Sequence, residues 1–235
     1  MRKTYAAKLR NVLSASIESG RLSEVLNELS ADELEFIAHD WELWARDEQL
    51  APSLIAPCDS PPGSRPQGAG LLDEPGTIKQ WRVWLLLGGR GSGKTRAGAE
   101  WVRSLALSSA TDEATSPRVA AGSRNASRNA PPRIALVGKT LGDVRNVMIE
   151  GQSGLLAIHP AHERPEFEPS KRRLTWPNGA VAELFSADEA EALRGPQFTA
   201  AWCDELAKWR GAERAWDMLQ FALRLGEAPR VAPYA

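Results

Sequence analysis

Residues 83–95 read VWLLLGGRGSGKT, an apolar run followed directly by a glycine-rich loop. The loop, from Gly88 to Thr95, matches the pattern G-x-x-x-x-G-K-[ST], whose glycines let successive backbone N–H groups point at one anion. Residues 83–87 have the composition of a buried strand, and the apolar positions of residues 95–106 favour a helix. A helix that begins at such a loop directs its positive end at the anion. The stretch therefore predicts a strand, a phosphate-binding loop and a helix.

Each residue of this loop has a predicted part in nucleotide binding. Lys94 reaches the β- and γ-phosphates, and the Thr95 hydroxyl is suited to ligate Mg²⁺. Arg90 is a candidate for neutralising charge on a transferred phosphoryl group. The other contacts are expected from the loop residues Gly88, Gly89, Gly91, Ser92 and Gly93. A glycine-rich turn that matches by accident is the alternative, but the flanking strand and helix that the mechanism needs are both predicted.

Composition and length limit the classes of protein that the chain can belong to. Its 235 residues can hold one α/β domain and a small appendage, and its 43% apolar and 25% charged fractions are ordinary for a globular protein. A net charge of −1 gives no overall basic field for nucleic acid. Cys58 and Cys203 lie far apart without metal-ligand spacing, which fits a reducing cytoplasm. No apolar run is long enough to span a membrane, and no signal peptide is recognised at the N-terminus.

The sequence divides into three parts by its patterning. Residues 1–52 are predicted to form a small helical unit of three helices, with Ser30 and Glu33 as a capping box. Residues 53–78 are rich in Pro, Gly and Ser, which indicates a linker or an insertion. Residues 79–235 form the predicted core, and a second stretch without periodicity, residues 108–132, interrupts it.

The core is expected to be a mostly parallel α/β sheet with flanking helices, of the phosphate-loop NTPase (RecA/ASCE-like) type. Asn178-Gly179 lies between two apolar runs and predicts a hairpin. Strands are expected at residues 133–138, 172–176, 180–185 and 198–203, and helices at residues 141–150 and 213–225.

The run FTAAWC, residues 198–203, ends in Asp204 and Glu205. An apolar strand followed by two acids is what a phosphate-loop ATPase needs beside its loop: Asp204 to hold Mg²⁺ and Glu205 to act as general base on water. Two solvated acids at a strand end are the alternative. Arg194 lies shortly before this strand and is a second candidate for neutralising phosphoryl charge, with an ordinary surface arginine as the alternative.

Four blocks of the sequence together resemble the large terminase subunit of tailed phages, and most closely its gene-transfer-agent and prophage branch. These blocks are WLLLGGRGSGKTRAGAEWV, LTWPNGAVAELFSA, LRGPQF and AAWCDELAKW. They occur in the family's order, and the resemblance covers most of residues 30–228. In that family an N-terminal ATPase domain drives double-stranded DNA into a procapsid and a C-terminal nuclease domain cuts it.

The resemblance implies ligands, roles and partners for this chain. ATP and Mg²⁺ are the implied cofactors, Gln49 matches the adenine-contacting glutamine, and Arg194 matches a position proposed to act in trans on a neighbouring subunit. Asp204 and Glu205 match the metal-binding and catalytic acids. The implied partners are double-stranded DNA, a small terminase subunit, a portal protein and further copies that form a ring, in the cytoplasm of a bacterial host and without a membrane.

One departure from the family concerns the C-terminal residues. The family continues into a Thr/Ser-rich coupling motif and the nuclease, neither of which occurs in these 235 residues. The strand after the acidic strand is central in such sheets, yet residues 230–235 are few and Pro233 cannot donate to a ladder. We therefore expect a truncated ATPase core whose sheet is incomplete at the C-terminus, marginally folded and nearly inactive.

Two other readings of the motifs stay open. The chain could be a phosphate-loop ATPase of the helicase or repair type, which shares the loop and the acidic pair. It could also be a non-catalytic remnant that binds nucleotide without turnover.

Overall fold

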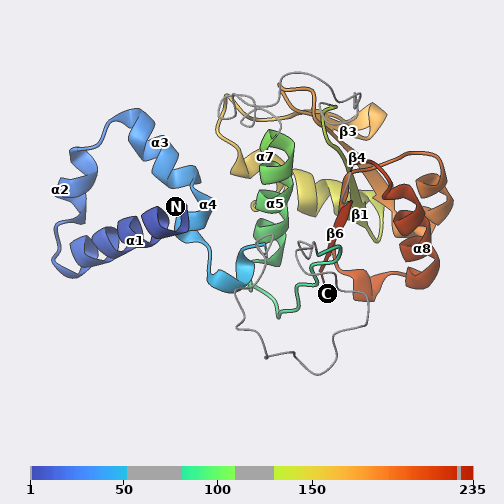
Figure 1. Cartoon of the computed structure of the whole chain (residues 1–235), viewed down its shortest axis with the longest axis horizontal. Helices are drawn as coiled ribbons and strands as arrows, with labels where there is room; N and C mark the ends of the chain where they lie inside the picture. Colours follow the sequence, from blue (N-terminus) through green and yellow to red (C-terminus); the bar gives the residue numbers. More distant parts are fainter. Residues whose placement is uncertain (1, 52–80, 109–129, 227–228, 235) are drawn as a thin grey trace, which may run out of the picture.

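The computed structural model describes residues 2–51, 81–108, 130–226 and 229–234, which form a helical N-terminal unit beside an α/β core (Figure 1). The predicted linker at residues 53–78 lies outside the described residues, as do residues 109–129 of the second irregular stretch. None of the described helices is long and apolar enough to cross a membrane.

The N-terminal unit consists of short helices, as the sequence predicts. Gly20 follows the first of them with a positive φ of 69°, and the Ser30–Glu33 capping box is formed. The predicted third helix is broken at Asp40, whose carboxylate accepts a hydrogen bond from the N–H of Leu43 and so caps a further helix. The elements are α1 (Arg2–Glu18), α2 (Leu22–Asn27), α3 (Ala31–His39), α4 (Trp41–Trp44) and η1 (Asp47–Gln49).

The core is a six-stranded sheet in the order β2-β3-β4-β1-β5-β6. Strands β4, β1, β5 and β6 run parallel, and β2, β3 and β4 form an antiparallel edge. Gly179, with a φ of 87°, lies in the predicted hairpin turn between β3 and β4. The strands are β1 (Arg133–Gly138), β2 (Glu166–Glu168), β3 (Arg173–Thr175), β4 (Val181–Ser186), β5 (Ala200–Cys203) and β6 (Arg230–Pro233).

Helices cover both faces of this sheet, and the side chains alternate between them. Ile134 and Leu136 of β1 point into one buried cluster with α5, while Ala135 and Val137 point into the other with α8. The first face carries α5 (Lys94–Ser108), α6 (Leu141–Asp143), the π-helical turn η2 (Val144–Ile149) and α7 (Leu155–Ile158). The second carries η4 (Ala187–Arg194), η5 (Leu206–Lys208) and α8 (Ala212–Ala222), and η3 (Pro169–Lys171) joins β2 to β3. The predicted α/β fold class is confirmed.

The expectation that residues 230–235 cannot supply a central strand is wrong. Strand β6 pairs with β5 on one side and forms bridges to Val83 and Leu86 on the other. The Tyr234 N–H donates to the Cys203 carbonyl, whereas the Val231 N–H donates to the carbonyl of Arg82. The backbone N–H groups of β6 therefore point alternately to its two neighbours. The nitrogen of Pro233 is on the same side as the Val231 N–H and faces residues 82–86, so its lack of a hydrogen affects that side only. One hydrogen bond is lost rather than a whole ladder.

The same proline explains why residues 83–87 form only two isolated bridges and not the predicted regular strand. The run is also less buried than predicted, because Trp84 is buried while Val83, Leu85 and Leu87 are 47%, 52% and 69% exposed. Among the described residues, this segment bonds to β6 along one edge, and one of its faces packs against the cluster that contains α5. Alternate side chains therefore differ in burial.

A buried histidine ties α7 to the end of β3. His159 is 1% exposed, and its Nδ1 lies 2.6 Å from the Leu155 carbonyl oxygen, to which it donates. Its Nε2 accepts a 3.0 Å hydrogen bond from Trp176 Nε1. Because the Trp176 N–H donates to Nε2, that nitrogen carries no proton and the ring is neutral. Burial lowers the pKa of His159 to about 4, against the opposing effect of the Leu155 carbonyl.

We predict that the free energy of unfolding falls as the pH is lowered from about 6.5 to about 4, by up to about 3 kcal/mol. In this window the unfolded chain binds a proton at His159 and the folded chain does not. Denaturant unfolding across this pH range measures the slope. His159→Gln should flatten it, whereas His162→Gln, at an exposed histidine, should leave it unchanged. If the free energy of unfolding of His159→Gln depended on pH as steeply as that of the wild type, groups other than His159 would cause the acid sensitivity.

Candidate functional site

The glycine-rich loop joins residues 82–87 to the first residue of α5, Lys94, as the sequence predicts. Gly91 and Gly93 have φ values of 75° and 81°, in the left-handed region where glycine is favoured. The Ala97 N–H already bonds to the Gly93 carbonyl, so the unpaired N–H groups of the helix are those at the loop. An anion bound at the loop would thus face the positive end of a fifteen-residue helix.

The Lys94 ammonium curls back over its own loop. It donates to the carbonyl oxygens of Gly88 and Gly89, the second at 3.2 Å. Arg90 is exposed, and it forms no hydrogen bond or ion pair with the described residues. Both cations of the loop are therefore available to a bound anion, because the hydrogen bonds of the Lys94 ammonium with described residues go to carbonyls of its own loop, which phosphate oxygens can replace.

The predicted acidic pair lies at the carboxyl end of β5, beside the end of β1. The Asp204 N–H donates to the Val137 carbonyl at 2.9 Å, which fixes the backbone at this point. Burial, together with the neighbouring Glu205 carboxylate, raises the pKa of Asp204 to about 6, and the Lys94 ammonium opposes the shift. The fold has thus brought the loop lysine and the acidic pair, about a hundred residues apart in the chain, within electrostatic reach.

The oxygen donors at this point suit Mg²⁺. No group of three or more His, Cys, Asp and Glu side chains in the described residues is arranged to hold a metal alone. A hard divalent cation here would take the half-buried Asp204 carboxylate together with hydroxyl and phosphate oxygens, which is how Mg²⁺ is usually bound. It would also relieve the repulsion between Asp204 and Glu205.

Glu205 has an unusual backbone. Its φ of 48° and ψ of 51° place it in the left-handed region, and only Arg172 shares a positive φ among the described non-glycine residues. The Glu205 carboxylate is 48% exposed and pairs with the Lys208 ammonium. A residue held in a sparsely populated conformation at a strand end fits a functional position.

Two residues of the N-terminal unit bond to the phosphate loop. Gln49, predicted to contact adenine, donates from Nε2 to the Ser92 carbonyl at 3.0 Å, and Arg46 donates to the same oxygen at 2.6 Å. The Gln49 Oε1 accepts from the Arg46 N–H at 2.9 Å. Sequence reasoning missed Arg46 as a site residue, although its spacing of three from Gln49 in a helical turn places both on one side.

Arg194 makes no described hydrogen bond or ion pair with this group. It ends η4, its side chain is 78% exposed, and it pairs with Glu191 at 3.6 Å. The structure therefore brings together Gln49, the loop, Asp204 and Glu205, but it does not add Arg194 to them through any described contact.

Comparisons with known proteins give a family match and structural similarities. The family model described as terminase large subunit, T4likevirus-type, N-terminal, matches residues 85–234. No curated protein matches the chain.

Several solved structures are similar at low identity. The large terminase from a thermophilic bacteriophage is 16% identical with a TM-score of 0.45, over 64% of this chain and 33% of that chain. The same protein in complex with ATP-gamma-S is 12% identical with a TM-score of 0.43, over 66% and 32%. The large terminase ATPase domain of Thermus phage P74-26 is 16% identical with a TM-score of 0.40, over 65% and 59%. The chain thus covers about a third of the length of the thermophilic phage's large terminase.

We predict that Gly93→Ala destabilises the protein more than Gly91→Ala. Both replacements cost about 1–2 kcal/mol because alanine disfavours the left-handed conformation. A Cβ at Gly93 would also lie 2.2 Å from Gln49 Nε2, whereas one at Gly91 meets no atom within 4 Å. Denaturant unfolding of both variants gives the difference.

The double variant Gly93→Ala/Gln49→Ala tests the cause. It should lose less stability than the two single effects together, because the clash is absent once Gln49 is truncated. Strict additivity would show that Gln49 does not lie on the loop in solution.

Proposed function

Because this chain belongs to the terminase large subunit family and contains its N-terminal region, we propose that it hydrolyses ATP to power movement of double-stranded DNA into a viral or gene-transfer-agent procapsid. Since the chain covers about a third of the thermophilic phage's large terminase, a part in DNA packaging is a proposal that rests on the family match.

One observation carries the ATPase proposal: the phosphate loop follows residues 82–87 and the acidic pair follows β5, the two segments that flank β6, and Lys94 acts electrostatically on Asp204. Either element alone is a weak signal. Together they supply a phosphate cradle, a metal carboxylate and a general base, which is the set that phosphoryl transfer to water requires.

In this proposal the loop backbone, from Gly88 to Gly93, binds the phosphates, and the Lys94 ammonium exchanges its carbonyl contacts for phosphate oxygens. Thr95 and Asp204 would hold Mg²⁺, which when bound neutralises charge on the β- and γ-phosphates. Gln49, which lies beside the loop and lines the adjoining cavity, would contact the adenine after leaving the Ser92 carbonyl.

The proposed chemistry at the γ-phosphate depends on two groups of the chain. Glu205 accepts a proton from the attacking water once its carboxylate is released by Lys208. Arg90, exposed on the loop and without a partner in the described residues, then stabilises charge on the phosphoryl group. Arg194, exposed on η4, would perform the same role on a neighbouring subunit in a ring.

The remaining proposals rest on the family alone. They are a small terminase subunit, a portal protein and other copies of the chain as partners, the cytoplasm of a bacterial host as location, and the gene-transfer-agent branch as origin.

Nucleotide binding without turnover is the second candidate, and one contact favours it. The carboxylate of the proposed base, Glu205, pairs with the Lys208 ammonium and is therefore not free to contact an attacking water. Wild-type protein that binds ATP tightly but releases no phosphate would support this candidate over the ATPase.

We expect Lys94→Ala to weaken ATP binding by about tenfold or more, because the loop loses its cation for the β- and γ-phosphates. Glu205→Gln should bind Mg-ATP normally and release phosphate about 10²-fold or more slowly, since the amide cannot accept a proton. Calorimetry and phosphate release measure the two effects. Glu213→Gln, at an exposed acid on α8, is the matched control. Unchanged ATP affinity in Lys94→Ala contradicts the site.

We expect Arg194→Ala to lower phosphate release only where subunits assemble, because the side chain acts across the subunit boundary. Mixing Arg194→Ala with Glu205→Gln subunits should restore part of the activity, as each supplies what the other lacks. Arg214→Ala is the control, since Arg214 also pairs with Glu191 and has no proposed part in the reaction. Mixed assemblies as inactive as either parent would refute the role in trans.

A further inference from the structure

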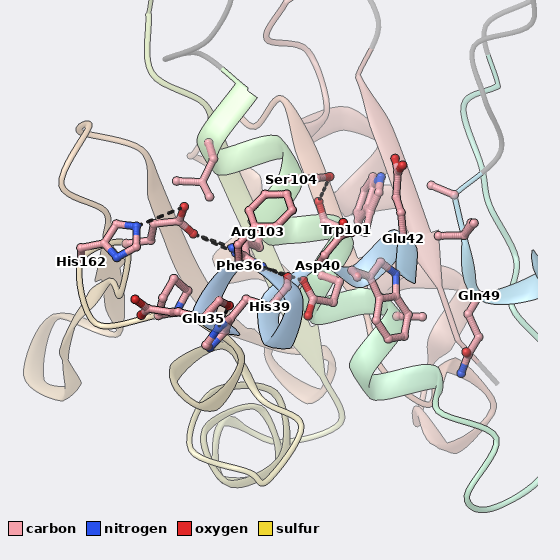
Figure 2. A pocket seen from close by; sticks show the side chains of 18 of the residues that line it. Glu35, Phe36, His39, Asp40, Glu42, Gln49, Trp101, Arg103, Ser104 and His162 are labelled. Carbon is pink, nitrogen blue, oxygen red and sulfur yellow. Dashed lines mark hydrogen bonds and ion pairs between the residues drawn. The ribbon is translucent and has the colours of Figure 1, made fainter. Parts of the chain in front are cut away.

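A cavity of about 1080 Å³ lies between the N-terminal unit and the core, outside the phosphate loop. Helices α3 and α4 form one wall, α5 forms the other, and the turn of residues 160–163 closes one end (Figure 2). Gln49 lies at one end of the cavity and His162 at the other, with Phe36, Arg103 and Trp101 between them (Figure 2). It adjoins the proposed nucleotide site but extends well past it along α5.

The two walls are helical faces. The α3 residues that line the cavity are Asp32, Glu35, Phe36 and His39, and those of α5 are Ala97, Glu100, Trp101, Arg103, Ser104 and Leu107. Both sets follow the three- and four-residue spacing of one side of a helix. The cavity is therefore a groove between two helices, the kind of surface into which a third helix packs its apolar side.

Helix α3 lacks the burial that would normally stabilise it. None of its nine residues is buried, and Phe36 is 59% exposed toward the cavity. Helices this short are marginal in water and depend on packing of one face, beyond what a capping box contributes. The exposed ring of Phe36 therefore offers apolar area that a packed partner would bury.

The groove is strongly acidic. Six carboxylates line it against the single guanidinium of Arg103, the two histidines aside: Asp32, Glu35, Asp40, Glu42, Glu100 and Glu163. Glu163 pairs with Arg103 at 2.7 Å, and Glu100 pairs with Arg96 at 2.7 Å and Arg103 at 3.4 Å. Asp32, Glu35 and Glu42 form no ion pair with any described residue. These three carboxylates leave a negative rim that repels phosphates and attracts cations.

We propose that this groove binds a basic amphipathic helix of a partner protein. The apolar side of that helix covers the exposed ring of Phe36, and its Lys or Arg side chains meet Asp32, Glu35 and Glu42. Cation–aromatic packing already occurs at this wall, where the Arg96 guanidinium lies 5.6 Å from the ring centroid of Trp41.

The test uses the full chain and a synthetic amphipathic helix of Lys and Leu, with a Glu and Leu helix as its counterpart. Calorimetric titration should show binding of the Lys helix only. Asp32→Lys/Glu35→Lys and Phe36→Ala should each weaken binding by about tenfold or more, because one reverses the rim charge and the other removes the exposed ring. All three residues are exposed, so circular dichroism should confirm an intact fold.

The matched control is Glu24→Lys/Glu28→Lys, which makes the same charge change at exposed positions in and after α2, away from the groove. It should leave the affinity within about twofold. An equal loss in the control would show general attraction to an acidic surface and overturn the proposal, as would the absence of binding. Displacement of the helix by spermidine at similar concentration would identify a small-cation site instead. The outcome does not depend on ATP hydrolysis, so it is separate from the proposed function.

Discussion

The pairing of β6 with both of its neighbours is the constraint on which the rest of the core depends. Its backbone pairs with the acidic strand β5 on one side. On the other side it bonds to residues 82–86 through the Val231 N–H, the Val231 carbonyl and the Pro233 carbonyl. Without this strand the phosphate loop would have no fixed distance to Asp204. The turn after Glu205 is attached to the same strand, because the Leu206 N–H donates to the Tyr234 carbonyl at 2.7 Å.

Close packing above β6 fixes the loop helix as well. Tyr234 packs edge-on against Trp84 and Trp202, and α5 crosses these rings at Gly98. A Cβ at Gly98 would lie 2.4 Å from atoms of both Trp202 and Tyr234. The helix can approach the sheet this closely only because Gly98 has no side chain. The position of Lys94 at the head of α5 therefore follows from aromatic packing one helical turn further on.

Local signals made several elements predictable. The spacing of Gly88, Gly93 and Lys94 set the start of α5, and Asn178-Gly179 set the hairpin, because each pattern has few backbone solutions. The features that could not be predicted depend on contacts between residues that are far apart in the sequence. Whether Pro233 interrupts a ladder is decided by which neighbour its nitrogen faces, and the contact of Gln49 with Ser92 joins segments forty-three residues apart. The sequence patterns also predicted the roles of Asp204 and Glu205, which remain proposals.

The backbone of Glu205 bears on how this position would change over evolutionary time. In its left-handed conformation glycine would be favoured, and asparagine tolerated, so selection for folding stability alone would replace the glutamate. Either replacement would discard the carboxylate. A lineage that kept the fold but lost hydrolysis would therefore be expected to drift toward glycine or asparagine at this position, while one under selection for turnover would keep an acid there at a standing cost in stability.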